Sequence, residues 1–198
     1  MAIIHPLVEG NLDEAAAFRI IEVTGHTPGT CYGKKGSGYI EQKVRSFNLT
    51  AHSTYYLALI DFMDTKLSCP PEVITNWLPN RQPKMLFRVV VREMESWLLA
   101  DKDNLAEFLK VRANRIPTNP EMVYDPKLEL INLARHSISS RIRSALVPEI
   151  GSTAQVGKLY NSEMRIFIDT LWNIHAARNY APSLDRCLRR LESLGEED

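Results

Sequence analysis

The sequence is poor in cysteine, and its cysteines are not spaced for a disulfide framework or a metal knuckle. Cys31, Cys69 and Cys187 are odd in number and far apart among the 198 residues. Neither paired disulfides nor a Cys-x-x-Cys metal site can be built from them. We therefore expect reduced thiols and a cytoplasmic protein.

The chain also lacks an excess of charge and any long apolar run. It has 24 basic and 24 acidic residues, a formal net charge of zero. A nucleic-acid partner would need a local basic patch, because the whole molecule supplies no attractive field. No segment approaches about 20 consecutive apolar residues, and the N-terminus lacks the basic and apolar parts of a signal peptide. The sequence thus predicts no membrane partner.

Several catalytic motifs are missing as well. The five histidines show no metal spacing such as H-E-x-x-H, and no G-x-S-x-G elbow occurs. The stretch "GTCYGKK", from Gly29 to Lys35, has one residue too few between its glycines for a P-loop and lacks the following Ser or Thr. These motifs therefore give no indication of ATP binding or of serine-hydrolase chemistry.

What the sequence does contain is an alternation of strand and helix patterns in its first half. Apolar runs at Ile3–Val8, Tyr55–Ile60 and Lys84–Val91 predict strands, and the segments between them carry apolar residues at helical spacing. This alternation predicts an α/β fold, a mostly parallel sheet flanked by helices, over residues 1–110. From about residue 121 only helical patterns follow, which predicts a helical extension over residues 111–198 packed on the core.

Local signals place the ends of some of these helices. Asn11 followed by Glu14 is typical of a capping box, and Gly25 is placed to end the same helix. Pro70 and Pro71 can begin another helix. Two tryptophans, Trp97 and Trp172, lie on apolar helical faces, and we expect them to pack in the core.

Acidic residues follow each of the three predicted strands. Glu9 follows the first strand, Asp61 and Asp64 the second, and Glu93 and Glu95 the third. The carboxyl ends of parallel strands lie on one edge of a sheet, where ligands bind. Convergent carboxylates repel each other, and a divalent ion such as Mg²⁺ removes that difficulty. The set therefore predicts a metal site, with a solvated acidic edge as the alternative interpretation.

The acidic pattern resembles that of Toprim domains. "VEGNLDEAAAFRII" followed by "LALIDFMD" is similar to the Toprim arrangement of a Glu after the first strand and paired Asp residues after a later one. Over most of its length the chain resembles an uncharacterised bacterial Toprim-like family, through "VEGNLDE", "LIDFMD", "REMESWLLAD", "DPKLELINLAR" and "APSLDRCLRRL". That family is distantly similar to the nuclease domain of OLD-type phage-defence proteins.

The resemblance implies roles for individual residues. Glu9 would be a metal ligand or general acid/base, and Asp61 and Asp64 would hold Mg²⁺ or Mn²⁺, with Glu95 as a further catalytic acid. The family's usual pair is Asp-x-Asp, whereas this chain has Asp-x-x-Asp. The sequence thus departs from the family pattern at Asp64. The one additional residue between the two aspartates changes the direction of the Asp64 side chain, and this direction decides whether Asp64 can be a metal ligand.

Basic residues supply candidates for phosphate contacts. Lys34 and Lys35 stand among glycines that could wrap a phosphate, with a plain flexible turn as the alternative. Lys127, Arg141 and Arg143 lie in a segment with an excess of basic residues and could clamp a nucleic-acid backbone, or could form a solvated helix face.

Two functions are therefore expected from the sequence. The first is a Mg²⁺-dependent enzyme that cleaves phosphodiester bonds in nucleic acid, a nuclease in phage defence. The second is a non-catalytic Toprim-like module that docks an ATPase partner or binds nucleic acid without cutting it.

Overall fold

The computed structural model describes residues 1–195, and contacts between residues divide the chain into two compact units. The first unit comprises Met1–Met94 together with the described residues from Ser183 onward, and the second is Glu95–Pro182. This division differs from the predicted boundary near residue 110. The chain leaves the first unit earlier than predicted and returns to it at the end.

The first unit is built on a parallel sheet, which confirms the predicted fold class. Among residues 1–195 the strand order is β2-β1-β4-β5, and β3 also pairs with β1. Every one of these pairings is parallel. The strands are β1 (Ile3–Val8), β2 (Thr27–Pro28), β3 (Tyr32–Gly33), β4 (Tyr55–Asp61) and β5 (Met85–Val90).

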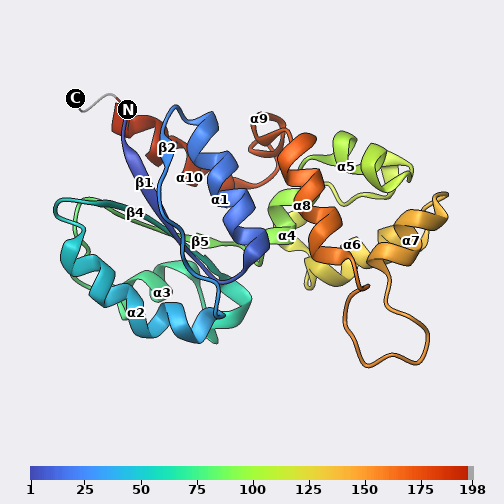
Figure 1. Cartoon of the computed structure of the whole chain (residues 1–198), viewed down its shortest axis with the longest axis horizontal. Coiled ribbons are helices and arrows are strands. Elements are labelled where there is room, and N and C mark those ends of the chain that lie inside the picture. Colours follow the sequence, from blue (N-terminus) through green and yellow to red (C-terminus); the bar gives the residue numbers. More distant parts are fainter. Residues whose placement is uncertain (196–198) are drawn as a thin grey trace. The chain divides into compact units, whose positions relative to one another are not determined.

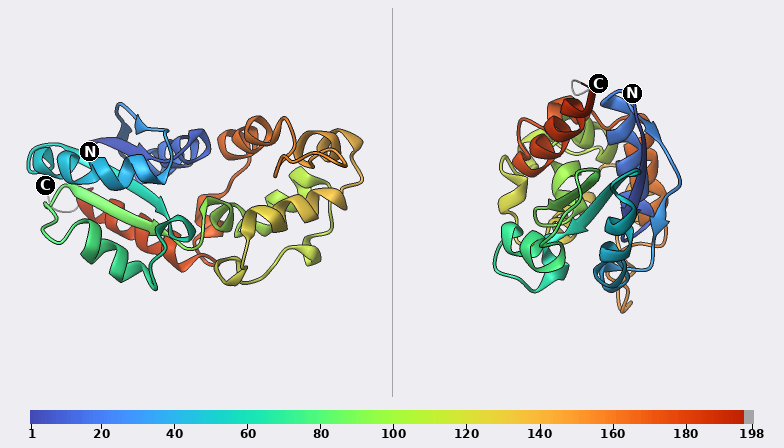
Figure 2. Two further views of the ribbon diagram at one scale, coloured as in Figure 1. Left: turned by 90° about the horizontal axis from the view of Figure 1, so that it is seen from below. Right: turned by 90° about the vertical axis from the view of Figure 1, so that its left-hand side faces the viewer.

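Helices cover both faces of this sheet, which explains why the central strands are apolar throughout. In Figures 1 and 2, α1 and α10 lie on one face and α2 and α3 on the other. Alternate residues of a strand point to opposite faces, and Tyr56, Ala58 and Ile60 pack toward α2 and α3. The helices are α1 (Asn11–Val23), α2 (Ser37–Thr50), α3 (Pro70–Trp77) and α10 (Pro182–Glu192).

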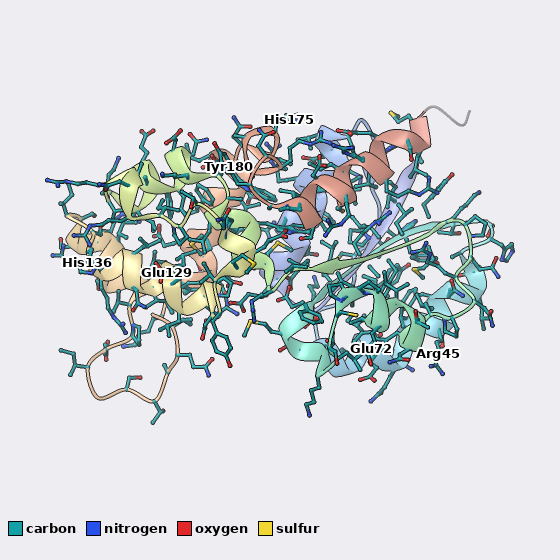
Figure 3. The ribbon with its side chains drawn as sticks, turned by 180° about the vertical axis from the view of Figure 1, so that it is seen from behind. Arg45, Glu72, Glu129, His136, His175 and Tyr180 are labelled. Carbon is teal, nitrogen blue, oxygen red and sulfur yellow. The ribbon has the colours of Figure 1, made fainter. Side chains whose placement is uncertain are left out.

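Two sets of polar contacts fix these helices within the unit. Arg45 on α2, labelled in Figure 3, donates from its Nε to the carbonyl oxygen of Trp77 at 3.1 Å and so holds the end of α3. On the other face, the Nε2 of His26 hydrogen-bonds the carbonyl oxygen of Leu191 at 2.9 Å. The second contact joins the chain segment after α1 to the last turn of α10.

The second unit is helical in the described structure. Trp97 and Trp172 are both buried in it, as predicted, and the indole N–H of Trp172 donates to the carbonyl oxygen of Trp97 at 3.3 Å. Its helices are α4 (Met94–Leu99), α5 (Lys102–Leu109), α6 (Pro126–Arg135), α7 (Ser140–Leu146), α8 (Tyr160–Thr170) and α9 (Ile174–Ala177), with short 3₁₀ turns η2 (Ala113–Arg115) and η3 (Pro120–Met122).

Within residues 1–195, no helix combines the length and the apolar character needed to cross a lipid bilayer.

Candidate functional site

Two acidic strand ends lie side by side at one edge of the sheet. β1 and β4 are parallel neighbours, with Leu7 paired to Ala58, so Glu9 and Asp61 follow at the same edge. The backbone N–H of Asp61 donates to the Oε1 of Glu9 at 3.1 Å. The first two of the three predicted acidic groups therefore meet.

Asp64 reaches the same place through a short 3₁₀ turn. The turn η1 (Phe62–Thr65) follows β4 directly, and it brings the Asp64 carboxylate close enough to Glu9 to raise the pKa of Glu9. In a 3₁₀ helix, side chains three residues apart lie on the same side. The N–H of Met63 donates to the carbonyl oxygen of Arg92 at 3.0 Å, which holds the turn beside the end of β5. The Asp-x-x-Asp spacing therefore brings Asp64 to Glu9.

Asp13 is an acidic neighbour of Glu9 that the sequence analysis did not identify. It is buried at the start of α1, and its Oδ2 accepts a hydrogen bond from the N–H of Gly10 at 2.7 Å. The helix cap is thus Gly10 with Asp13, one residue earlier than the predicted pair of Asn11 and Glu14. The sequence could have indicated this cap, because a carboxylate at the third position of a helix often accepts a hydrogen bond from the N-cap backbone.

The environment of Glu9 disfavours its charged form. Burial, together with the negative charges of Asp64 and Asp13, raises the pKa of the Glu9 carboxyl to about 8, against the opposing effect of the hydrogen bond from the N–H of Asp61. Carboxyl groups in this arrangement keep a proton or share a cation. The three acidic side chains, Glu9, Asp64 and Asp13, are called the acidic edge below.

Only an ion that takes one or two protein ligands is compatible with the acidic edge. No group of three or more His, Cys, Asp or Glu side chains placed to hold a metal ion occurs in the range 1–195. Mg²⁺ is usually bound through one or two carboxylates and keeps several waters. Glu9 and Asp64 would hold it, since their carboxyl groups already approach each other.

The glycine-rich loop after β3 fixes the backbone beside the acidic edge. The N–H of Lys34 donates to the carbonyl oxygen of Val8 at 2.8 Å, and the N–H of Gly36 to that of Glu9 at 3.0 Å. Gly33 has a φ of +97°, and a Cβ there would lie 2.2 Å from the carbonyl oxygen of Val8. Only glycine fits this position without displacing β1.

The two lysines predicted to contact phosphate from this loop have partners in the protein. The Nζ of Lys34 lies 2.9 Å from the Oε1 of Glu14. The Nζ of Lys35 lies over the ring of Tyr39, 5.4 Å from its centroid. Glu14, predicted as a helix cap, is instead the ion-pair partner of Lys34.

Glu95, predicted as a further catalytic acid, belongs to the second unit and has partners there. It is 2% exposed, and its Oε1 accepts a hydrogen bond from the hydroxyl of Tyr160 at 2.9 Å. The Nζ of Lys127 lies 3.5 Å from the same oxygen. These contacts give Glu95 and Lys127 a structural role, and the catalytic and phosphate-binding roles predicted for them stay predictions.

The two predicted arginine contacts are also engaged within the second unit. Arg141 forms an ion pair with Glu163. Arg143 donates to the carbonyl oxygen of Ser137. Their side chains therefore help hold α7 (Ser140–Leu146) in place, and binding of phosphate by them stays a prediction.

A basic cavity in the second unit was not anticipated from the sequence. It has a volume of about 610 Å³ and includes one acidic side chain, Glu107. His136, at the end of α6 and labelled in Figure 3, contributes to it. The sequence feature that could have indicated this cavity is the close spacing of three basic residues, Lys110, Arg112 and Arg115, in "KVRANR". Its lining residues are Ala106, Glu107, Lys110, Val111, Arg112, Arg115, His136 and Ile138.

Comparison of the chain with protein-family models, with curated proteins and with solved structures found no match.

Proposed function

We propose that this protein is a Mg²⁺- or Mn²⁺-dependent enzyme that cleaves phosphodiester bonds in nucleic acid, a nuclease of phage defence as the resemblance to Toprim domains implies. One observation carries the proposal: Glu9 meets Asp64 and the backbone of Asp61 at the carboxyl edge of a parallel sheet. Ligands of open parallel sheets bind at this edge.

Each acidic side chain has a distinct task in this proposal. Glu9 and Asp64 hold the ion, with the carboxylate of Asp61 as the further predicted ligand, and Asp13 adds negative charge while its carboxylate caps α1. The N–H of Asp61 fixes the orientation of the Glu9 carboxylate. When bound, the ion supplies Lewis-acid polarisation of a phosphoryl oxygen and a water of lowered pKa. In the absence of the ion, Glu9, with a pKa near 8, keeps its proton at neutral pH, and binding of the ion would release that proton.

A metal titration tests the proposal. The melting temperature of the wild type should rise with Mn²⁺ or Mg²⁺ concentration, because an ion that binds only the folded state stabilises it. Glu9→Gln and Asp64→Asn should lose most of this rise in melting temperature. Their rate of DNA or RNA cleavage should fall by at least about 100-fold. Glu41→Gln, which removes an exposed carboxylate from α2, is the matched control and should behave like the wild type. Equal metal responses in all four proteins would refute a metal site at the acidic edge.

The second candidate function is nucleic-acid binding without cleavage. The basic cavity favours it, because Lys110, Arg112 and Arg115 surround a concave surface in the second unit. Phosphate contacts of this kind need no metal and weaken with salt. If nucleic acid bound in EDTA and Arg115→Gln lowered the salt dependence while no metal response appeared, this second function would replace the first. Docking of an ATPase partner stays a prediction.

A further inference from the structure

A cavity of the first unit lies along β5, and no residue of the acidic edge lines it. It has a volume of about 380 Å³. One wall is the start of α3, with Pro70, Pro71 and Ile74, and the opposite wall is the start of α10, with Ser183 and Arg186. Phe87, Arg88 and Val89 of β5 form the floor. This cavity is called the β5 pocket below.

The floor of the β5 pocket is the open edge of the sheet. β5 is the last strand in the order β2-β1-β4-β5. The N–H of Tyr56 donates to the carbonyl oxygen of Lys84 at 3.0 Å, so the backbone groups of every second residue from Lys84 onward face β4. Those of Phe87 and Val89 therefore face outward into the pocket. At the end of this outward series, the N–H of Val91 donates to the Oγ of Ser183 at 3.3 Å.

Two guanidinium groups in the β5 pocket have no acidic partner. No hydrogen bond or ion pair joins the side chain of Arg88 or of Arg186 to another residue in the range 1–195. The Nε of Arg88 is buried and has no hydrogen-bond partner in that range. None of the lining residues is acidic. Asp185, the nearest carboxylate along α10, lies 2.8 Å from the Nε of Arg189 instead.

The surroundings of Arg88 are positively charged. Burial lowers the pKa of its guanidinium, and the charges of Arg81, Arg190 and Arg186 lower it further, while Cys187 acts in the opposite direction. A buried polar atom without a partner and a concentration of like charge both cost free energy. An anion in the pocket would offset this concentration of positive charge.

We propose that the β5 pocket binds a phosphate monoester of nucleotide size through the guanidinium groups of Arg88 and Arg186. Two guanidinium groups match a phosphate monoester, which carries nearly two negative charges at neutral pH and three acceptor oxygens. The cavity lies in the size range of small-molecule sites, which leaves room for more than a bare phosphate. The apolar wall of Pro70, Pro71 and Ile74 accommodates the rest of the ligand.

The proposed phosphate site does not depend on the proposed metal chemistry. The pairing of β4 with β5 nevertheless places the β5 pocket and the acidic edge on neighbouring strands. Asp61 pairs with Val90, and Arg88 precedes Val90 by two residues. A phosphate in the β5 pocket would therefore lie one strand away from the metal-binding edge. Both a free nucleotide and the phosphorylated end of a strand carry the required chemistry.

Calorimetric titration of the full chain with adenosine monophosphate, in EDTA and at low salt, tests this site. We expect binding in the range of about 1 mM or tighter, and at least about tenfold weaker binding of adenosine, which lacks the phosphate. Arg186→Gln, on an exposed position of α10, should weaken binding of the monophosphate at least about tenfold. Arg88→Gln should do the same.

The matched control is Arg189→Gln, which removes another exposed arginine of α10 that does not line the pocket and should leave binding unchanged. Asp64→Asn should also bind the monophosphate normally, so failure of the metal proposal would not affect this result. If a 5′-phosphorylated oligonucleotide binds more tightly than the monophosphate, the ligand is the phosphorylated end of a nucleic-acid strand. If it binds more weakly, the ligand is a free nucleotide.

Three results would overturn the proposal. The first is equal binding of adenosine and its monophosphate. The second is an equal effect of Arg186→Gln and Arg189→Gln. The third is no binding of the monophosphate while a tetraglutamate peptide binds, because the open edge of β5 would then be accepting an acidic peptide strand.

Discussion

At the scale of single residues, Glu9 connects the strand ends that form the acidic edge. Its carboxylate accepts a hydrogen bond from the N–H of Asp61 and interacts with the nearby carboxylate of Asp64. The sequence was sufficient to predict that these three positions meet, because parallel strands share a carboxyl edge. The sequence was not sufficient to predict that Asp13 lies near Glu9. The effect of Asp13 on the pKa of Glu9 depends on how the start of α1 is oriented relative to β1.

The raised pKa of Glu9 predicts how stability depends on pH in the absence of metal. Between the usual pKa of 4.5 and about 8 the folded state binds more protons than the unfolded state, so this group's contribution to stability falls as pH rises. Glu9→Gln should therefore gain stability relative to the wild type from pH 5 to pH 8, by about 2 kcal/mol after allowance for partial exposure.

Urea unfolding in EDTA at the two pH values measures this difference. Glu41→Gln, the exposed control, should show the same pH dependence as the wild type. A Glu9→Gln curve parallel to that of the wild type would mean that the carboxyl ionises normally in the folded protein.

At the scale of elements, the long strands were predictable and the shortest ones were not. Runs of apolar residues identified β1, β4 and β5 nearly to the residue. β2 and β3 have two residues each, so no periodicity can appear in them, and the glycine-rich segment that contains them was expected to be a turn or a phosphate loop.

In the second unit, the apolar sequence pattern does not identify which helix faces are buried. Leu128, Ile166 and Leu171 continue the apolar patterns of their segments, yet each is more than 40% exposed. The buried positions of α8 include Met164, Phe167 and Ile168 instead. When apolar residues lie on more than one face of a short helix, the packing of its neighbours decides which face is covered.

Glycine substitutions test the role of the loop after β3. Gly33→Ala should lower the free energy of unfolding by about 2 kcal/mol, because φ is positive and the new Cβ would meet the carbonyl oxygen of Val8. Gly38→Ala, at the start of α2, meets no atom within 4 Å and should raise it by about 0.5 kcal/mol. Chemical denaturation of both variants gives the comparison, and equal effects would show that the loop does not constrain β1.

At the scale of the molecule, the first unit is discontinuous in the sequence. α10 follows the whole second unit along the chain, yet Leu184, Leu188 and Leu191 are buried in the first unit. Composition and periodicity could not predict that α10 packs in the first unit. The sequence of an amphipathic helix shows which face is apolar, but it does not specify the surface that this face covers. The predicted boundary at residue 110 assumed that neighbouring segments stay together.

Replacing one buried residue of α10 tests this discontinuity. Leu188→Ala should cost about 2 to 5 kcal/mol by leaving a cavity in the first unit. Hydrogen exchange should then speed up in β1 and β4 more than in the helices of the second unit. Arg189→Ala, the next residue and an exposed one, is the control. Equal loss of protection in both units would indicate that they unfold together.

The position of α10 also has a consequence for synthesis on the ribosome. The strands of the first unit emerge before residues 95–182, but the helix that completes one face of their sheet is made only afterwards. The nascent sheet therefore keeps part of one apolar face uncovered while the intervening segment is translated, so the first-synthesised unit is the last to complete its core.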